Sequence, residues 1–398
     1  QGDVGSGKTV ISALALAKAV ENGYQGCIMV PTEILAAQHF ETLEQYLQPY
    51  GVRIALLTGG MRAKARRELL LNLELGLVDV VVGTHALLEE DVRFANLSLT
   101  VTDEQHRFGV EQRARLSNKS ENAPDVLVMT ATPIPRTLAL TVYGDLDISV
   151  MKGRPPQRKP VRTLCYTDER RREVYAGLVR QVQAGRQAYV VCPLIEESDV
   201  LAVHSAERVY EELKCDFLQD IPCALLHGRL KGAEKDAIMS SFAAGELKVL
   251  VSTTVIEVGV NVPNATLMVI ENAERFGLAQ LHQLRGRVGR GSEQSYCVLL
   301  TAADSPEALA RLNVLHESED GFYLAEKDME QRGAGQLFGL KQHGLPDLRI
   351  ADIMRDVDVI AQVRQLAQAQ LRTPEDWAEI RRLVEMQFGE RFNMIFNT

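Results

Sequence analysis

The residues at the start of the printed sequence have the types and the spacing that bind phosphate groups. They match the pattern G-x-x-x-x-G-K-[ST], with Gly2, Asp3, Val4, Gly5, Ser6, Gly7, Lys8 and Thr9 in order. The glycines let successive backbone N–H groups point at phosphate oxygens, the lysine reaches the β- and γ-phosphates, and the threonine hydroxyl can ligate Mg²⁺. Apolar residues follow at helical spacing, which disfavours a chance glycine-rich turn. We therefore predict an ATP-type nucleotide site at residues 2–9.

Two acidic residues follow an apolar run that reads as a strand at 99–102. Asp103 is expected to hold the Mg²⁺ that Thr9 also ligates, usually through water. Glu104 can accept a proton from the water that attacks the γ-phosphate. A polar turn after a strand is the structural alternative, and the phosphate-binding loop favours the catalytic interpretation.

The composition is that of a globular chain with two or three domains. The chain has 398 residues, 46% of them hydrophobic and 24% charged, and a net charge of −9. This charge argues against a basic surface overall, although a local basic face could still bind nucleic acid. Residues 152–172 hold eight cations against two acids, but the prolines there make a solvated linker an equal alternative. No apolar run predicts a membrane span.

The six cysteines predict no disulfide framework and no zinc site. They lie at 27, 165, 192, 215, 223 and 297, without a C-x-x-C pair. Reduced thiols in a cytosolic protein are the expected state.

Short apolar runs alternate with amphipathic stretches, as in parallel α/β sheets covered by helices. The first series predicts strands at 26–30, 53–57, 78–82, 99–102 and 126–130, with helices at 34–47 and 62–75. The second predicts strands at 161–166, 188–192, 223–226, 249–252, 267–270 and 296–300, after which only helices are expected. The predicted domains are 1–152, a linker at 153–160, a second α/β domain at 161–305, a helical hairpin region at 306–358 and a helical tail at 359–398.

The position of the phosphate loop is unusual. A buried strand normally precedes such a loop, and here almost nothing does; the first residue is also not Met. We therefore expect the chain to be part of a longer protein, and we expect these residues alone to have weak activity.

The acidic pair belongs to a set of motifs that resembles the superfamily-two nucleic-acid helicases. Residues 103–106 match that family's Asp-Glu-x-His, with His106 at the last position, and residues 283–290 resemble its Q-x-x-G-R-x-G-R. The resemblance implies that Gln283 contacts the nucleotide. It also implies that Arg287 and Arg290 stabilise charge on the transferred phosphoryl group, across the ATP from Lys8. Because they are three residues apart, we expect both arginines on one helix face. A basic surface helix is the alternative, disfavoured by the glycines between them.

The same resemblance assigns DNA-binding or coupling roles to short motifs. The tripeptides at 31–33, 58–60 and 83–85 pair small hydroxyls or glycine amides, which suits phosphate contacts that read no bases. The motif at 130–132 is similar to the one that couples hydrolysis to movement, and a strand end before Pro133 is its structural alternative. Residues 252–263 resemble the family's fifth motif, with Asn261 where many relatives have Asp. The predicted residues are Pro31, Thr32, Thr58, Gly59, Thr84, His85, His106, Thr130, Thr132, Thr253, Arg332 and Gln342.

Longer stretches at 103–112, 129–137, 274–283 and 342–347 are similar to the RecG family of bacterial DNA helicases. The resemblance covers about residues 1–360. It implies two tandem RecA-like parallel-sheet domains, followed by a helical hairpin called the TRG motif that contains Arg332 and Gln342. Ala334 stands there where the family usually has Pro.

The RecG resemblance implies ATP and Mg²⁺ as cofactors and branched or duplex DNA as the partner. The implied activity is remodelling of stalled replication forks and Holliday junctions, in the bacterial cytoplasm at the nucleoid and without a membrane. A monomer is favoured, and replication and repair proteins are candidate partners. The closest alternative is an Mfd-like duplex translocase of transcription-coupled repair, which typically has Asp-Glu-Glu-His at this motif. A transporter ATPase is disfavoured because Leu-Ser-Gly-Gly-Gln is absent, and the intact Lys8, Asp103, Glu104 and Arg290 disfavour a non-enzymatic remnant.

Overall fold

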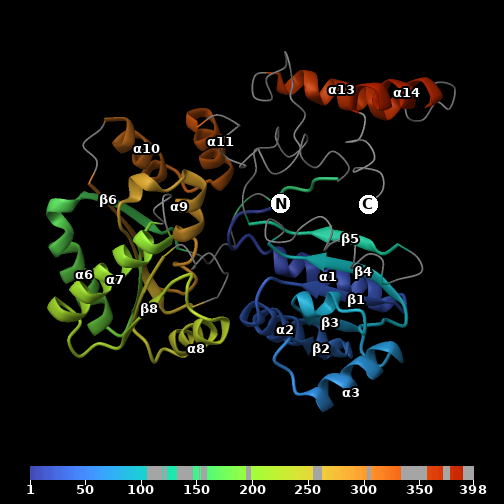
Figure 1. The fold of residues 1–398 in the computed structure, drawn as a ribbon, viewed down its shortest axis with the longest axis horizontal. Helices are drawn as coiled ribbons and strands as arrows, with labels where there is room; N and C mark the ends of the chain where they lie inside the picture. The colour runs from blue at the N-terminus through green and yellow to red at the C-terminus, as the bar shows by residue number, and fades with distance from the viewer. Residues whose placement is uncertain are drawn as a thin grey trace.

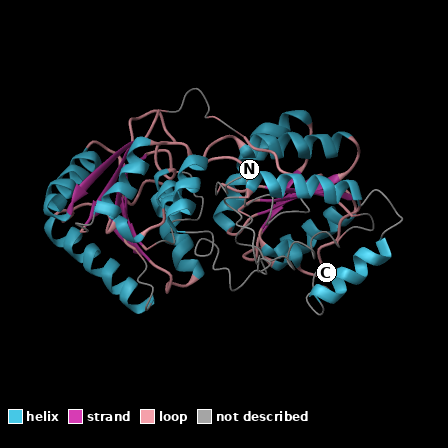
Figure 2. Ribbon diagram, turned by 90° about the horizontal axis from the view of Figure 1, so that it is seen from above, coloured by secondary structure: helices cyan, strands magenta, loops and turns pink. Residues whose placement is uncertain are grey.

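The structure, a computed structural model, contains two parallel β-sheets that lie side by side, each covered by helices (Figures 1 and 2). It describes residues 1–104, 119, 123–131, 147–151, 153, 159–193, 199–253, 262–302, 306–332, 356–370 and 377–388. Three predicted site residues, His106, Thr132 and Gln342, lie outside these ranges. The predicted fold class, two tandem parallel-sheet α/β units with helices after them, is confirmed.

The first sheet has the strand order β2-β3-β1-β4-β5, and every neighbouring pair is parallel. Its strands are β1 (Gln25–Met29), β2 (Ile54–Leu57), β3 (Val80–Gly83), β4 (Leu97–Thr102) and β5 (Asp125–Val128). Its helices are α1 (Lys8–Glu21), α2 (Glu33–Leu47) and α3 (Ala63–Glu74), with 3-10 turns η1 (Gln48–Tyr50) and η2 (His85–Leu88).

Both faces of this sheet are buried, which explains its continuous apolar runs. Ile28 of β1 packs in a core cluster with residues of α1 and α2. Its neighbours Cys27 and Met29 pack on the opposite face, with Leu73 of α3. Successive side chains of a strand point to opposite faces, so each residue of β1 has a helix to pack against.

The second sheet has the order β6-β11-β10-β7-β9-β8, again with all neighbouring pairs parallel. Its strands are β6 (Arg162–Thr167), β7 (Gln187–Val191), β8 (Cys223–Leu226), β9 (Val249–Ser252), β10 (Ala265–Ile270) and β11 (Tyr296–Thr301). The elements between them are η4 (Asp168–Arg170), α6 (Arg171–Gln183), α7 (Asp199–Asp216), α8 (Gly232–Ala243), η6 (Ala273–Arg275) and α9 (Leu278–Arg285).

The helices after the second sheet are α10 (Pro306–Glu317), α11 (Gly321–Arg332), α13 (Val357–Gln370) and α14 (Trp377–Phe388). Leu312 and Leu315 of α10 and Leu324 of α11 share a core cluster with Leu281 and Leu284 of α9. The helices α10 and α11 therefore pack on the second sheet unit (Figure 1). Across the described ranges, no helix is both long and apolar enough to cross a membrane.

The structure bears on two smaller interpretations of the sequence, those of the cysteines and of the basic stretch. All six cysteines are free, and Cys27, Cys192 and Cys297 are buried. Within the basic stretch at 152–172, Arg170 pairs with Glu173 and stacks on a tyrosine ring, while Arg171 pairs with Glu271. These two cations are paired within their own domain, at the start of α6, rather than in a linker. Binding of nucleic acid by the stretch as a whole stays a prediction.

Candidate nucleotide site and nucleic-acid interface

The loop at residues 2–9 folds around its own lysine. Gly5 and Gly7 have φ of 73° and 95°, in the left-handed region that glycine adopts without strain. Gly7 is the N-cap of α1, so the loop opens directly into the N-terminus of a helix. The Lys8 ammonium donates to the carbonyl oxygens of Gly2 and Asp3 at 2.8 and 2.9 Å. This geometry fits an anion site at a helix N-terminus.

The charges around Lys8 come from both sheets. Burial lowers the pKa of Lys8, the negative charges of Asp103, Glu104 and Asp3 oppose that shift, and the positive charge of Arg290 adds to it. Arg290 follows α9 of the second sheet unit, whereas the acids belong to the first. The described structure therefore brings the predicted Lys8, Asp103, Glu104 and Arg290 into one electrostatic environment.

Asp103 lies directly after β4 and is held by two hydrogen bonds. Its Oδ2 is 3.0 Å from Nε2 of His39 in α2, and its Oδ1 accepts the backbone N–H of Glu104 at 3.0 Å. Burial alone would raise the pKa of Asp103, but the hydrogen bond and charge of His39 and the charge of Lys8 hold it below its usual value. The carboxylate is therefore kept ionised.

Glu104 has φ of 56° and is one of two non-glycine residues with positive φ among those described. Such a conformation costs about 1–3 kcal/mol and is concentrated at functional sites. It turns the chain sharply at the end of β4, next to the nucleotide loop.

The donor set suits Mg²⁺ carried by a nucleotide. Among the described residues, no three His, Cys, Asp or Glu side chains are grouped so that they could hold a metal by themselves. A nucleotide-bound Mg²⁺ usually takes only one or two protein ligands and keeps several waters. The ionised Asp103 beside Lys8, with the Thr9 hydroxyl in the first turn of α1, fits that requirement.

The expectation that Arg287 and Arg290 share a helix face is wrong. Helix α9 ends at Arg285, Gly286 is its C-cap, and Gly289 has φ of 75°, so both arginines lie in the segment after the helix. Arg287 is buried, and Arg290 donates from Nε to the carbonyl of Gly286 at 3.3 Å. Gln283, the first residue of the motif, lies within α9 and is partly buried.

The predicted DNA-binding loops of the first sheet all follow the carboxyl ends of parallel strands, the edge where α/β proteins bind ligands. Pro31 and Thr32 follow β1, Thr58 and Gly59 follow β2, and Thr84 and His85 follow β3. Two of the loops are joined, because Glu33 accepts the N–H of Gly60 at 3.0 Å.

The hydroxyls of these loops have different roles. The Thr32 hydroxyl accepts the N–H of Leu35 at 3.4 Å and so caps α2. Thr84 and Thr253 are each only 1% exposed, and within the described ranges neither hydroxyl has a hydrogen-bond partner. Thr253 follows β9 of the second sheet.

Two further predicted residues are placed only by their backbone. The carbonyl oxygen of Thr130 accepts the N–H of Gly2 at 3.4 Å. Arg332 is the last residue of α11, and its side chain lies outside the described part of the chain.

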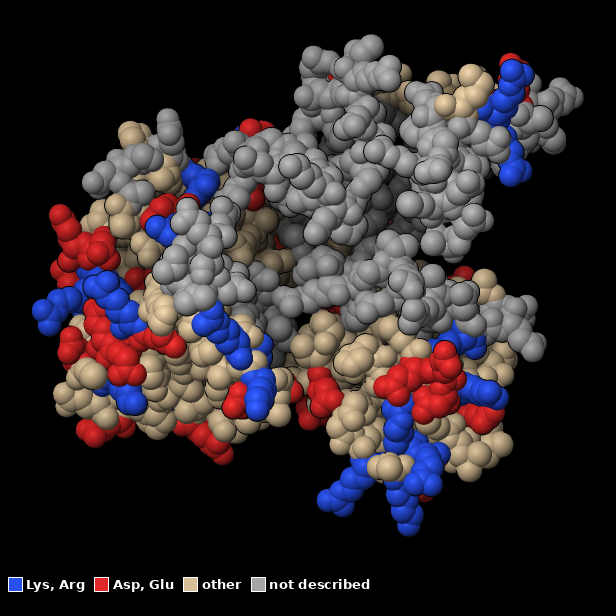
Figure 3. Space-filling model, viewed as in Figure 1, with Lys and Arg blue, Asp and Glu red and all other residues tan. Residues whose placement is uncertain are grey.

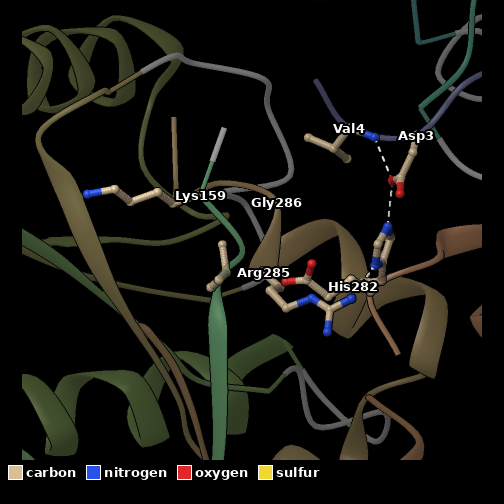
Figure 4. A pocket seen from close by; sticks show the side chains of 8 residues that line it. Asp3, Val4, Lys159, His282, Arg285 and Gly286 are labelled. Atoms are coloured by element: carbon tan, nitrogen blue, oxygen red, sulfur yellow. Dashed lines mark hydrogen bonds and ion pairs between the residues drawn. The ribbon is translucent and has the colours of Figure 1, made fainter. Parts of the chain in front are cut away.

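Sequence reasoning missed His39, His282 and Arg285. His39 lies on the buried face of α2 with Leu35 and Leu43, and a polar residue on an apolar face is the signal that could have found it. Arg285 lies at an unspecified position of the arginine motif, and His282 directly precedes the motif. Figure 4 shows His282 facing Asp3 of the nucleotide loop and Arg285 beside His282, around a pocket that Lys159 and Gly286 also line.

A phosphate loop on one parallel sheet, beside a paired-arginine segment on a second, is the core architecture of superfamily-two helicases. The DEAD/DEAH box helicase family matches residues 1–141, and the helicase conserved C-terminal domain matches residues 170–292. The C-terminal part of domain 3 of the ATP-dependent DNA helicase RecG matches residues 318–387. The chain belongs to the RecG family.

The relatives support this assignment over nearly the whole chain. The ATP-dependent DNA helicase RecG of Bacillus subtilis is 50% identical over 379 residues, which are 95% of this chain and 55% of the relative. RecG of Escherichia coli K12 is 50% identical over 372 residues, 92% of this chain and 54% of the relative. The chain thus spans about half the length of the curated relatives it matches.

Solved structures agree. A structure of RecG bound to a three-way DNA junction is 45% identical, covers 90% of this chain and 46% of that chain, and has a TM-score of 0.76. Saccharomyces cerevisiae Dbp5, at 18% identity and a TM-score of 0.58, covers 81% of this chain and 82% of its own and shares the fold alone.

Proposed function

We propose that the protein is an ATP-dependent DNA helicase that remodels branched DNA, including stalled replication forks and Holliday junctions. The observation that carries the proposal is that Arg290, which follows α9 of the second sheet, acts electrostatically on Lys8 of the first, as Asp103 and Glu104 also do. Support also comes from the RecG relatives and from the three-way junction bound by the similar solved RecG. Because the chain is about half identical to RecG, the Mfd-like alternative is not favoured.

Each residue of the proposed site has a task. Lys8 and the loop amides bind the phosphates, while Thr9 and Asp103 would hold Mg²⁺, which supplies positive charge at the β- and γ-oxygens. Glu104 accepts a proton from the attacking water. Arg287 and Arg290 approach from the second sheet and stabilise the developing charge.

We infer movement of the two sheet units from the division of the nucleotide-site residues between them. Because they belong to two sheet units, closing around ATP and reopening after hydrolysis changes how the units are placed. The loops after β1, β2, β3 and β9 would hold the DNA backbone, together with the predicted Thr130, Arg332 and the undescribed His106, Thr132 and Gln342. We place this activity in the bacterial cytoplasm, at the nucleoid, with no membrane partner.

The proposal is tested in the full-length protein, by ATP hydrolysis with forked, duplex and single-stranded DNA. Lys8→Ala and Glu104→Gln should each lower the DNA-stimulated rate by about 100-fold or more, because each removes a group that acts on the transferred phosphoryl or the water. The control is Lys18→Ala, an exposed lysine of the same helix that pairs with Glu21. Normal hydrolysis in either site variant, or no preference for branched DNA, would overturn the proposal.

A further inference from the structure

The Asp3 carboxylate joins the nucleotide loop to two helices of the other sheet unit. Its Oδ1 accepts the N–H of Val4 at 2.6 Å and lies 2.5 Å from Nε2 of His282 in α9 (Figure 4). Its Oδ2 accepts the N–H of Gly321, the first residue of α11, at 3.4 Å. Asp3 was expected to contact nucleotide, but its side chain points at α9 rather than along the loop (Figure 4).

The protonation of His282 is defined by its second partner. Arg285 donates from Nη2 to Nδ1 of His282 at 2.9 Å. A guanidinium can only donate, so Nδ1 must be the acceptor and the ring proton lies on Nε2. His282 therefore donates to Asp3 as a neutral imidazole, and the contact is a hydrogen bond from a ring whose tautomer is fixed.

Arg285 in turn fixes His282 to the helices that follow. Its Nη1 donates to the carbonyl oxygens of Leu315 and Ser318, at 2.7 and 2.9 Å, beside the end of α10. At the other end of α9, Asp328 of α11 accepts the N–H of Leu278 at 3.1 Å. Helix α9 is thus hydrogen-bonded at its C-terminal end to the end of α10 and at its N-terminal end to α11. These contacts hold His282 in place as a hydrogen-bond donor to the loop.

Packing accompanies the polar contact. A Cβ placed on Gly286 would lie 2.8 Å from the Cβ of Val4, so the loop touches the end of α9 more closely than any other residue type at 286 would allow. Burial would raise the pKa of Asp3, but its hydrogen bond to His282 holds the pKa below its usual value. The carboxylate is ionised where it meets the imidazole.

These contacts link the loop that carries Lys8 to the segment that carries Arg287 and Arg290. We propose that Asp3 is a positioning residue that acts through His282 and sets where this arginine segment lies relative to the nucleotide loop. The inference rests on the proposed function, because its consequence is the rate of hydrolysis. The phosphates themselves are bound by the loop amides and Lys8, so removing the Asp3 carboxylate should spare nucleotide binding.

Three variants test this with forked DNA. Asp3→Ala should lower kcat by about tenfold, because a small misplacement of a catalytic group is that costly, while the Kd of a fluorescent ATP analogue changes by less than about twofold. Asp3→Asn keeps an oxygen that accepts from His282 and should stay within about threefold of the wild type. Asp3→Ala combined with His282→Ala should lower kcat no more than Asp3→Ala alone, since both substitutions remove the same hydrogen bond between Asp3 and His282. Glu317→Ala, which removes an exposed carboxylate of α10, is the matched control.

A second readout is independent of hydrolysis. Dyes on the exposed Cys215 of α7 and on Glu41→Cys of α2 report the spacing of the two sheet units by energy transfer. Asp3→Ala should shift or broaden the transfer efficiency, and Asp3→Asn should not. Absence of hydrolysis in the wild type would defeat the proposed function and leave this spacing test to decide on Asp3. An unchanged kcat, an unchanged spacing, or a Kd that weakens as much as kcat would overturn the inference.

Discussion

Asp103, the proposed Mg²⁺ ligand, shows how a partly buried carboxylate stays ionised. An isolated buried charge would neutralise, and burial does act to raise the pKa of this group. The hydrogen bond from His39, the N–H of Glu104 and the nearby Lys8 reverse that effect. His39 therefore both orients one oxygen of Asp103 and preserves the charge that a Mg²⁺ ligand needs.

We predict that His39→Ala raises the Mg²⁺ concentration for half-maximal ATP hydrolysis by about 10- to 100-fold, because loss of a partner behind a metal ligand usually lowers the metal affinity by that factor. His39→Gln keeps an N–H donor at a similar distance along the side chain and should recover part of the loss. The measurement is the Mg²⁺ concentration for half-maximal hydrolysis. A normal Mg²⁺ requirement in His39→Ala would contradict a role for Asp103 at the metal.

At the scale of elements, the strands were predictable from the sequence. Every expected strand of both sheets is present, and each boundary differs by two residues or fewer. Doubly buried parallel strands appear as short apolar runs between turns, and that pattern depends only on local sequence. The loops after these strands then gather at one edge, which explains why motif residues far apart in the chain share one site.

Contacts between elements were not predictable in the same way. The Asp3–His282 pair joins residues 279 positions apart, and nothing local marks either as the partner of the other. The error at Arg287 and Arg290 has a local cause, since the three-residue spacing fits a helix but Gly286 and Gly289 end it. The domain boundaries and the roles of the site residues stay predictions.

The turn after α9 gives a prediction for a whole segment. Gly289→Ala places a side chain at φ of 75° and within 2.6 Å of Val161 Cγ2, so we expect it to lower the free energy of unfolding by about 1–3 kcal/mol. It should also lower kcat, because it moves Arg290. Gly245→Ala has a similar φ of 77° with nothing within 4 Å, and it should cost only about 1 kcal/mol with normal hydrolysis. Urea unfolding and steady-state rates distinguish the two variants, and equal rates would argue against a role for this turn.

At the scale of the whole molecule, the net charge of −9 means that DNA has to bind at a local basic surface. The face shown in Figure 3 has such a surface at α3. Its exposed cations are Arg62, Lys64 and Arg67, and the first turn of this helix has no acid. Arg66 differs, because it pairs with Glu89 at 2.8 Å. Helix α3 begins just after the predicted DNA-binding loop at 58–60, so its cations would extend that contact along the backbone.

We therefore expect Lys64→Ala with Arg67→Ala to weaken binding of forked DNA at every sequence tested, without changing ATP hydrolysis in saturating DNA. A variant that contacts fewer phosphates releases fewer counterions when it binds DNA. The slope of log K against log salt should therefore fall in magnitude by about 1 per lost cation, or about 2 in the double variant. Arg208→Ala, which changes an exposed arginine of α7 on the other sheet unit, is the control and should leave the slope unchanged. Fluorescence anisotropy over a salt series measures both quantities. If the double variant keeps the wild-type slope, the DNA does not run along α3, and the negative overall charge must be overcome by the strand-end loops alone.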